Sequence, residues 1–260
     1  MSERLRSLGD VFRKPVRAAG FAAVTSGMLA LYEMRELFEP RERRTELLVR
    51  WKKRYLELVA RIFALDVVVT GDVPRGPEPG RGRLVVSNHR SAIDIAVLWM
   101  LFDAQMLSRA DIDRWPVIGR GARKLGTIFV DRAQRTSGAA AIRTIRRRLE
   151  QGATVCVFPE GTTFAGDDVR PFRPGSFAAA RGLDIEIVPV GLAYESGAEF
   201  VDETFVAHLG RVAARPRTRI VVAIGQPRRG CVDPAERARE MRDEVQRLVG
   251  EARSAFARSE

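Results

Sequence analysis

The stretch "RLVVSNHRSAIDIAVLWMLF", residues 83–102, decides the fold. It begins as a short run of branched apolar residues, passes through a polar turn, and continues as a longer apolar run over residues 92–102. A strand followed directly by a helix is the repeating unit of α/β proteins. Similar strand-like runs occur elsewhere, at residues 66–71, 126–131, 153–158, 185–192 and 219–225. Helical stretches lie between most of them, so strands and helices are expected to alternate.

This alternation predicts a layered α/β domain with a largely parallel sheet flanked by helices. The strands are hydrophobic almost throughout, which indicates that both faces of the sheet are buried. Gly152 and Gly182 follow two of the helical stretches, as C-terminal glycines commonly do. The chain closes with a charged helix that we expect to begin at Asp233, with Pro234 in its first position. We therefore assign residues 66–260 to this domain.

Residues 1–65 are predicted to form a helical hairpin that associates with a membrane. The uncharged run over residues 18–32 is shorter than the roughly 20 residues that span a bilayer. It fits an interfacial or re-entrant membrane helix, a buried core helix or, least well, a true span. The next helix, over residues 44–65, is basic and amphipathic, and it carries Trp51 and Tyr55. The pair favours a monotopic hairpin on an anionic leaflet.

The composition indicates a globular protein with an anionic partner. Hydrophobic residues make up 45% of the chain, and the net charge is +11. Nucleic acid, an acidic membrane or phosphorylated small molecules would suit that charge, although a genomic bias toward arginine explains it equally well. Cys156 and Cys231 form neither a disulfide framework nor a zinc-binding pattern. We expect no bound metal and a reducing, cytoplasmic-side location.

His89 lies in the turn between the strand and the helix of the opening stretch, where α/β sheets bind ligands. Asp94 follows five residues later and has two explanations. With Ser91 it fits the start of a helix, in which a serine caps the end and an acid occupies the first turn. Alternatively, it accepts the Nδ1–H of His89 and leaves Nε2 free to act as a base. The local pattern alone favours the cap, but the two explanations are compatible.

Three further stretches place residues suited to an anionic substrate near the ends of strands. They are "GTIFVDR" at 126–132, "VFPEGTT" at 157–163 and "PFRPGSF" at 171–177. Guanidinium groups bind phosphate in a bidentate manner, and a glycine lets backbone N–H groups approach an anion. The candidates are Arg132, Glu160, Gly161, Thr162, Thr163 and Arg173. A fourth stretch, "IVPVGL" at 187–192, is expected to form a wall of the site.

With these stretches in this order, the chain resembles the glycerolipid acyltransferases, the lysophosphatidate acyltransferase family. "NHRSAID" resembles that family's NHxxxxD block, and "GTIFVDR", "FPEGTT" and "VPVGL" resemble its second, third and fourth blocks. The resemblance covers residues 83–226, and the N-terminal helices resemble the membrane-embedding hairpin of bacterial members. One departure concerns the third block, which often ends in arginine where this chain has Thr163. The acceptor headgroup is therefore left open.

The resemblance implies acyl transfer from acyl-CoA or acyl-carrier protein to the free hydroxyl of a lysophospholipid. Lysophosphatidate, giving phosphatidate, is the expected acceptor, and another lysolipid such as lyso-ornithine lipid is the alternative. His89 would be the general base, oriented by Asp94, while Arg132 and the "EGT" residues 160–162 would hold the glycerol phosphate. The thioester is already activated, so neither an enzyme-bound nucleophile nor a cofactor is expected. The implied location is the cytoplasmic face of the cell membrane, as a peripheral or monotopic protein.

Other classes fit less well. A serine hydrolase would need a GxSxG elbow, which the chain lacks. A nucleic-acid-binding module could use the arginines of "IRTIRRRLE", but no aromatic stacking platform accompanies them, so no nucleic-acid partner is expected. A non-catalytic basic protein of the membrane surface would not need His89, Asp94 and Glu160 together. His208, the second histidine, is interpreted as structural or peripheral because no carboxylate partner is evident.

Overall fold

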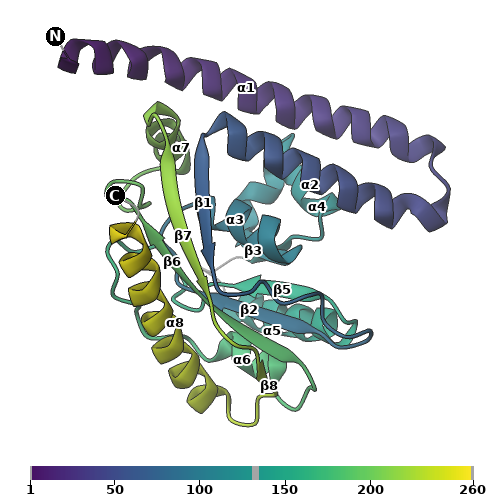
Figure 1. The fold of residues 1–260 in the computed structure, drawn as a ribbon. Coiled ribbons are helices and arrows are strands. Elements are labelled where there is room, and N and C mark those ends of the chain that lie inside the picture. The colour runs from purple at the N-terminus through teal and green to yellow at the C-terminus, as the bar shows by residue number, and fades with distance from the viewer. Residues whose placement is uncertain (1, 131–134, 259–260) are drawn as a thin grey trace.

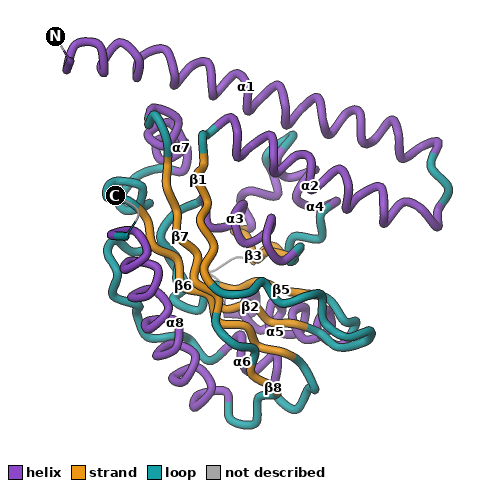
Figure 2. The backbone as a smooth tube through the Cα atoms, in the orientation of Figure 1, coloured by secondary structure: helices purple, strands orange, loops and turns teal. Residues whose placement is uncertain are grey.

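The computed structural model describes residues 2–130 and 135–258, with the side chains of residues 2–11, 109 and 135–137 left undescribed. Its centre is a sheet of eight strands among these residues (Figures 1 and 2). The strands are β1 (Leu65–Thr70), β2 (Arg83–Ser87), β3 (Gln105–Arg109), β4 (Ile128–Val130), β5 (Thr154–Val157), β6 (Glu186–Tyr194), β7 (Thr218–Ile224) and β8 (Arg228–Arg229).

The sheet has the order β1-β7-β6-β2-β5-β3-β4, and β8 pairs with β6. Every pair along this order is parallel except β6–β7, and β8 also runs antiparallel to β6. The predicted, largely parallel sheet is therefore confirmed. All six predicted strands are present, whereas β3 and the two-residue β8 were not predicted.

Helices cover both faces of the sheet. They are α1 (Ser2–Phe38), α2 (Arg44–Ile62), α3 (Ile93–Phe102), α4 (Ile118–Lys124), α5 (Arg135–Glu150), α6 (Gly175–Ala180), α7 (Phe205–Ala214) and α8 (Pro234–Ala257), with short 3-10 turns at Arg41–Arg43 and Ala110–Arg114. In β2, Val85 packs with residues of α2, α3 and α7, whereas Leu84 and Val86 pack with residues of α5, α6 and α8. This alternation explains why the strand is apolar throughout.

Several helix ends match their sequence signals. Asp233 caps α8 by accepting the backbone N–H groups of Ala235 and Glu236. Gly152 and Gly182 adopt φ values of 77° and 72°, the left-handed conformation that glycine tolerates after a helix. The sequence did not predict α4 or α7. The first residue of α7, Phe205, lines the cleft described below.

The N-terminal residues form a hairpin of two long helices, but its first helix is longer than the apolar run (Figure 1). Helix α1 continues through the charged residues on both sides of residues 18–32. Its inner side packs on α2, where Phe21 meets Phe63, the residue that ends that helix, edge to face with ring centroids 5.6 Å apart. Arg17 also donates to the carbonyl oxygens of Arg215 and Pro216. Among the described residues, no helix has both the length and the apolar character needed to cross a membrane.

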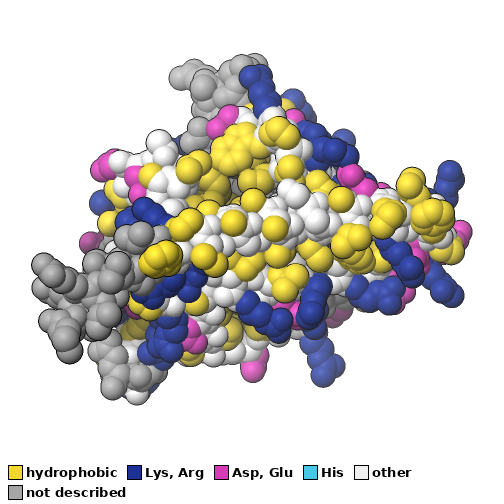
Figure 3. Space-filling model, turned by 90° about the horizontal axis from the view of Figure 1, so that it is seen from above, with side chains coloured by type: hydrophobic (Ala, Val, Ile, Leu, Met, Phe, Trp, Pro, Cys, Tyr) yellow, Lys and Arg dark blue, Asp and Glu magenta, His cyan; other side chains and the backbone are white. Residues whose placement is uncertain are grey.

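The outer side of the hairpin exposes apolar side chains. Figure 3 looks down on this surface and shows hydrophobic side chains gathered along it, with Lys and Arg on its borders. On α1 the exposed apolar residues are Phe12, Val16, Leu31, Met34, Leu37 and Phe38. A helix that only filled a core would not carry such a row, because large apolar surfaces facing water are unusual.

Candidate active site

A cleft of about 970 Å³ lies beyond the carboxyl ends of β2, β3, β4 and β5. It is the edge of the sheet at which parallel α/β proteins bind ligands. The sequence stretches that were predicted to meet there contribute His89, Val130, Phe158 and residues 161–163. Other polar side chains in its lining were not predicted: Ser108, Asp111, Arg114, Asp202 and Glu203.

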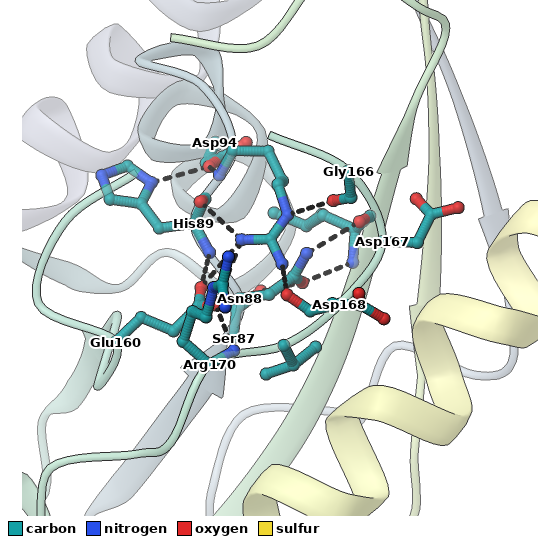
Figure 4. Close-up of polar contacts among 12 residues, drawn as sticks. Ser87, Asn88, His89, Asp94, Glu160, Gly166, Asp167, Asp168 and Arg170 are labelled. Carbon is teal, nitrogen blue, oxygen red and sulfur yellow. Dashed lines mark hydrogen bonds and ion pairs between the residues drawn. The ribbon is translucent and has the colours of Figure 1, made fainter. Parts of the chain in front are cut away.

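His89 and Asp94 lie in contact at the inner end of this cleft. The His89 Nδ1 atom is 2.7 Å from Asp94 Oδ2, and the carboxylate is fully buried. The imidazole ring is stacked on Phe158, with centroids 4.0 Å apart and planes inclined by 9°. Figure 4 shows the ring extending from the polar network with its second nitrogen on the outer side. In the described part of the chain nothing hydrogen-bonds Nε2, so that nitrogen is available to a ligand in the cleft.

Asp94 also organises the first turn of α3, so the predicted cap and the predicted pair coexist. Its Oδ2 atom accepts the backbone N–H of Arg90 at 2.7 Å and of Ser91 at 2.9 Å. The helix itself begins at Ile93, whose N–H donates to the Ser91 hydroxyl at 3.3 Å. The residue at the cap position is Ala92, which has no capping side chain, so Ser91 acts one residue earlier than the usual N-cap.

Tyr194, at the end of β6, completes the hydrogen bonding of Asp94. Its buried hydroxyl donates to Asp94 Oδ1 at 2.5 Å. Burial, and then the neighbouring negative charge, holds the pKa of Tyr194 well above its ordinary value, so the phenol keeps its proton and remains a donor. Donors therefore engage both oxygens of the Asp94 carboxylate.

Glu160 contacts protein groups, whereas the resemblance implied that it would contact the substrate phosphate. Its carboxylate is buried and accepts the backbone N–H of His89 at 2.6 Å and the Arg90 guanidinium at 3.0 Å (Figure 4). A third donor is the N–H of Arg170 at 2.9 Å. With its oxygens taken by protein groups, Glu160 is not a direct contact for a phosphate in this structure. It fixes the backbone of His89 instead.

Arg90 was missed by sequence reasoning, although it is among the largest fully buried side chains. Besides Glu160, its guanidinium binds the carbonyl oxygens of His89, Gly166 and Asp168, at 2.7–3.0 Å. The loop after β5 is thereby tied to the turn after β2. The available signal was the position of Arg90 itself, since a cation beside an interior strand needs a buried partner.

The remaining predicted residues differ in their placement. Gly161, Thr162 and Thr163 line the cleft with His89. Gly161 has φ +87°, and a Cβ there would lie 2.8 Å from the Arg173 guanidinium carbon, so Arg173 packs against the glycine and is itself exposed. Arg132 lies outside the described residues.

None of residues 187–192, the "IVPVGL" stretch that was predicted to form a wall of the site, is among the described residues that line the cleft. The stretch is nevertheless attached to the turn before His89. The Asn88 side chain donates to the carbonyl of Leu192 at 2.9 Å and accepts its N–H at 2.8 Å. A side-chain amide can pair with a backbone amide in this way through one donor and one acceptor. Asn88 thus continues the pairing of β2 with β6 and fixes the residue immediately before His89.

Comparisons with known proteins assign the family. The "Acyltransferase" family model matches residues 66–193. A lyso-ornithine lipid O-acyltransferase of Pseudomonas aeruginosa is 31% identical over 89% of this chain and 90% of its own length. The chain belongs to the acyltransferase family. The resemblance predicted from the sequence is confirmed, and the protein is an acyltransferase.

Two further similarities bear on this acyltransferase. A 1-acyl-sn-glycerol-3-phosphate acyltransferase of Neisseria meningitidis is 31% identical over 60% of this chain and 56% of its own length. The crystal structure of a 1-acyl-sn-glycerophosphate acyltransferase from Thermotoga maritima superposes with a TM-score of 0.77. That match covers 95% of this chain and 98% of the other, at 20% identity, and shows a common fold.

In this acyltransferase, His, Cys, Asp and Glu side chains do not gather in a group of three able to hold a metal ion, as far as the described residues extend. The groups arranged for chemistry at the cleft are an imidazole with one accessible nitrogen and a buried carboxylate behind it. Such a pair can remove a proton from a hydroxyl and hold the resulting imidazolium.

The Tyr194→Phe variant tests how much the hydrogen bond from Tyr194 to Asp94 Oδ1 contributes to the stability of the acyltransferase. Removing this hydroxyl deletes a donor to a buried charge, so we expect the free energy of unfolding to fall by about 1.5–3 kcal/mol. Urea denaturation measures it. Tyr55→Phe is the matched control, because among the described residues the Tyr55 hydroxyl bonds an uncharged partner, the Thr25 hydroxyl, at 3.1 Å. An equal or smaller loss in Tyr194→Phe would contradict the prediction.

Proposed function

We propose that this acyltransferase moves a fatty acyl group from a thioester to the free hydroxyl of a lysolipid, with His89 as general base. The observation that carries the proposal is the orientation of His89, whose Nδ1 is held by Asp94 while Nε2 faces the cleft. Nε2 takes the hydroxyl proton as the oxygen attacks the thioester carbonyl. The tetrahedral intermediate then expels the thiolate, which recovers the proton from the imidazolium. Asp94 orients the ring and stabilises its charged form.

An apolar groove beside the cleft supports a lipid substrate. Phe21, Met28 and Leu29 of α1 line it, and all three belong to the uncharged run over residues 18–32. Trp51 and Tyr55 of α2 face them across the groove. Phe205 lines both the groove and the cleft, so the two adjoin. We propose that an acyl chain occupies the groove while its carbonyl or hydroxyl end reaches His89.

The hairpin gives the enzyme a means of reaching a substrate that resides in a bilayer. Its exposed apolar side chains suit the acyl region of an anionic lipid surface, and the surrounding basic residues suit the headgroups (Figure 3). We therefore propose that α1 and α2 lie on the cytoplasmic face of the cell membrane. The donor is acyl-CoA or acyl-carrier protein, both of which leave as a thiol.

The sequence predicted lysophosphatidate as the acceptor, but two observations favour the alternative, lyso-ornithine lipid. The Pseudomonas aeruginosa relative, whose match covers 89% of this chain, is named for that lipid. In addition, the carboxylates of Asp111 and Asp202 line the described part of the cleft beside one guanidinium, of Arg114, whereas the third carboxylate, of Glu203, already pairs with Arg211. An ornithine headgroup carries an ammonium that suits such a surface, whereas a phosphate monoester is only anionic. Thr163, in place of arginine, shifts the charge balance the same way.

An acceptor panel tests the proposal. The purified enzyme is given acyl-CoA or acyl-carrier protein with lyso-ornithine lipid, lysophosphatidate or another lysophospholipid, and thiol release is measured. We expect release to depend on the acceptor, and lyso-ornithine lipid to exceed lysophosphatidate by about tenfold in kcat/KM, or ~1.4 kcal/mol. A preference for lysophosphatidate would overturn the acceptor assignment alone. If none of these acceptors raised thiol release with either donor, the acyl transfer itself would be refuted.

A further inference from the structure

The second histidine of the chain is also part of the site's structure. His208, in α7, is fully buried, and its Nε2 lies 2.9 Å from the Ser91 hydroxyl and 3.4 Å from the backbone nitrogen of Ala92. Sequence reasoning treated it as structural or peripheral without a carboxylate partner. The structure corrects this, because Glu203 Oε1 lies 3.1 Å from Nδ1. Phe200 stacks on the ring at 4.7 Å.

The neighbours of His208 determine where its proton resides. The N–H of Ala92 can only donate, so Nε2 must be the accepting nitrogen. The Ser91 hydroxyl donates its proton to the same atom, because an unprotonated Nε2 can only accept. Nδ1 then carries the proton and donates it to Glu203. Arg211 also approaches Nδ1, at 3.2 Å, but it is satisfied by Glu203 and by the carbonyl of Glu199.

Burial lowers the pKa of His208, and Glu203 only partly opposes this, so the ring is neutral at pH 7. A neutral ring with its proton on Nδ1 is the form that accepts two hydrogen bonds at Nε2. His208 therefore acts as a fixed acceptor for the turn formed by residues 91–92. The same turn supplies two N–H groups to Asp94, from Arg90 and Ser91.

From this arrangement we infer that His208 is a positioning residue for the His89–Asp94 pair. It clamps the turn that holds Asp94 in place, from a helix 117 residues away in sequence. Asp94 in turn fixes the tautomer and orientation of His89. A small displacement of a catalytic group is costly, because an error of about 1 Å can reduce the rate about 10²-fold. The inference rests on the proposed function, in which His89 is the base.

Two substitutions of His208 distinguish the role of Nε2 from that of Nδ1. In His208→Gln the side-chain amide reaches the place of Nε2, where its oxygen can accept from Ser91 and Ala92. In His208→Asn the shorter amide reaches only the place of Nδ1, and the turn loses its acceptor. We expect kcat of the Gln variant to stay within about threefold of the parent, and kcat of the Asn variant to fall by about tenfold or more. The KM for donor and acceptor should change little in either variant.

A spectroscopic measurement tests the clamp independently of turnover. The chain has two histidines, so in either variant a ¹⁵N-histidine NMR spectrum reports His89 alone. We expect the Gln variant to keep the His89 proton on Nδ1, facing Asp94, and the Asn variant to show a mixture of tautomers. Thermal unfolding confirms that both variants are folded at the assay temperature.

Several results would overturn the inference. An Asn variant with parental kcat and an unchanged His89 tautomer would show that the clamp does not position the pair. Equal losses in the Gln and Asn variants, with His89 unchanged in both spectra, would assign His208 a purely structural role. If the parent transferred no acyl group to any acceptor, the proposed function would fail, yet the two spectra would still decide whether His208 fixes the orientation of His89.

Discussion

The His89→Ala variant is expected to retain its fold and to lose acyl transfer, with kcat lowered by about 10²–10⁴-fold. The reason is that Nε2 is the described group placed to take the hydroxyl proton in the cleft. The ring stacks on Phe158 but is not part of the hydrophobic core, so its removal should cost little stability. Thiol release from acyl-CoA, measured with and without the lysolipid acceptor, gives the rates. KM for the donor should change little.

Controls distinguish loss of the base from general damage. Val232→Ala alters a residue that is 87% exposed, and it should behave as the parent in rate and in thermal unfolding. Asp94→Asn should lower kcat to a similar extent, because an amide at this position can donate to Nδ1 and favour the wrong tautomer. The double variant should be little worse than either single one, since the two residues act as a unit. Parental rates in His89→Ala would refute the base assignment.

The contact between His89 and Asp94 could be predicted because it is local. Asp94 follows His89 by five residues, so the turn between β2 and α3 is enough to bring the two side chains near each other. The strands were predictable for a similar reason, since continuous apolar runs report burial on both faces of a sheet. β3 was missed because its sequence, "QMLSR", mixes polar and apolar residues without alternation.

The partners that hold this pair could not be predicted, because they arrive from distant parts of the chain. Glu160 meets Arg90 across 70 residues, and Tyr194 meets Asp94 across 100. Sequence spacing carries no information about such contacts until the order of the strands is known. His208 is different, because Glu203 precedes it by five residues, the same separation as between His89 and Asp94. That local signal was present in the sequence and was overlooked.

The Glu160→Ala variant should lose stability rather than only substrate affinity. Arg90 and Glu160 form an ion pair whose side chains are 2% and 0% exposed. Removing the carboxylate leaves a buried guanidinium without its counter-charge, which typically costs about 3–5 kcal/mol. It also removes the acceptor for the backbone N–H of His89, so activity should fall with stability. Urea denaturation at pH 7 measures the change in the free energy of unfolding.

A compensating variant makes this prediction specific to the buried charge. In Arg90→Met combined with Glu160→Leu, both charges are replaced by apolar side chains, so the part of the loss in Glu160→Ala that comes from an unpaired buried guanidinium should return. The part that comes from unpaired backbone groups should remain, because the carbonyls of His89, Gly166 and Asp168 lose their donor. Activity should not return, because the N–H of His89 still lacks its acceptor. If Glu160 instead contacted substrate, as its sequence position suggested, Glu160→Ala would unfold like the parent and show only a raised KM for the acceptor. That result would reverse the assignment of Glu160 to the scaffold beneath His89.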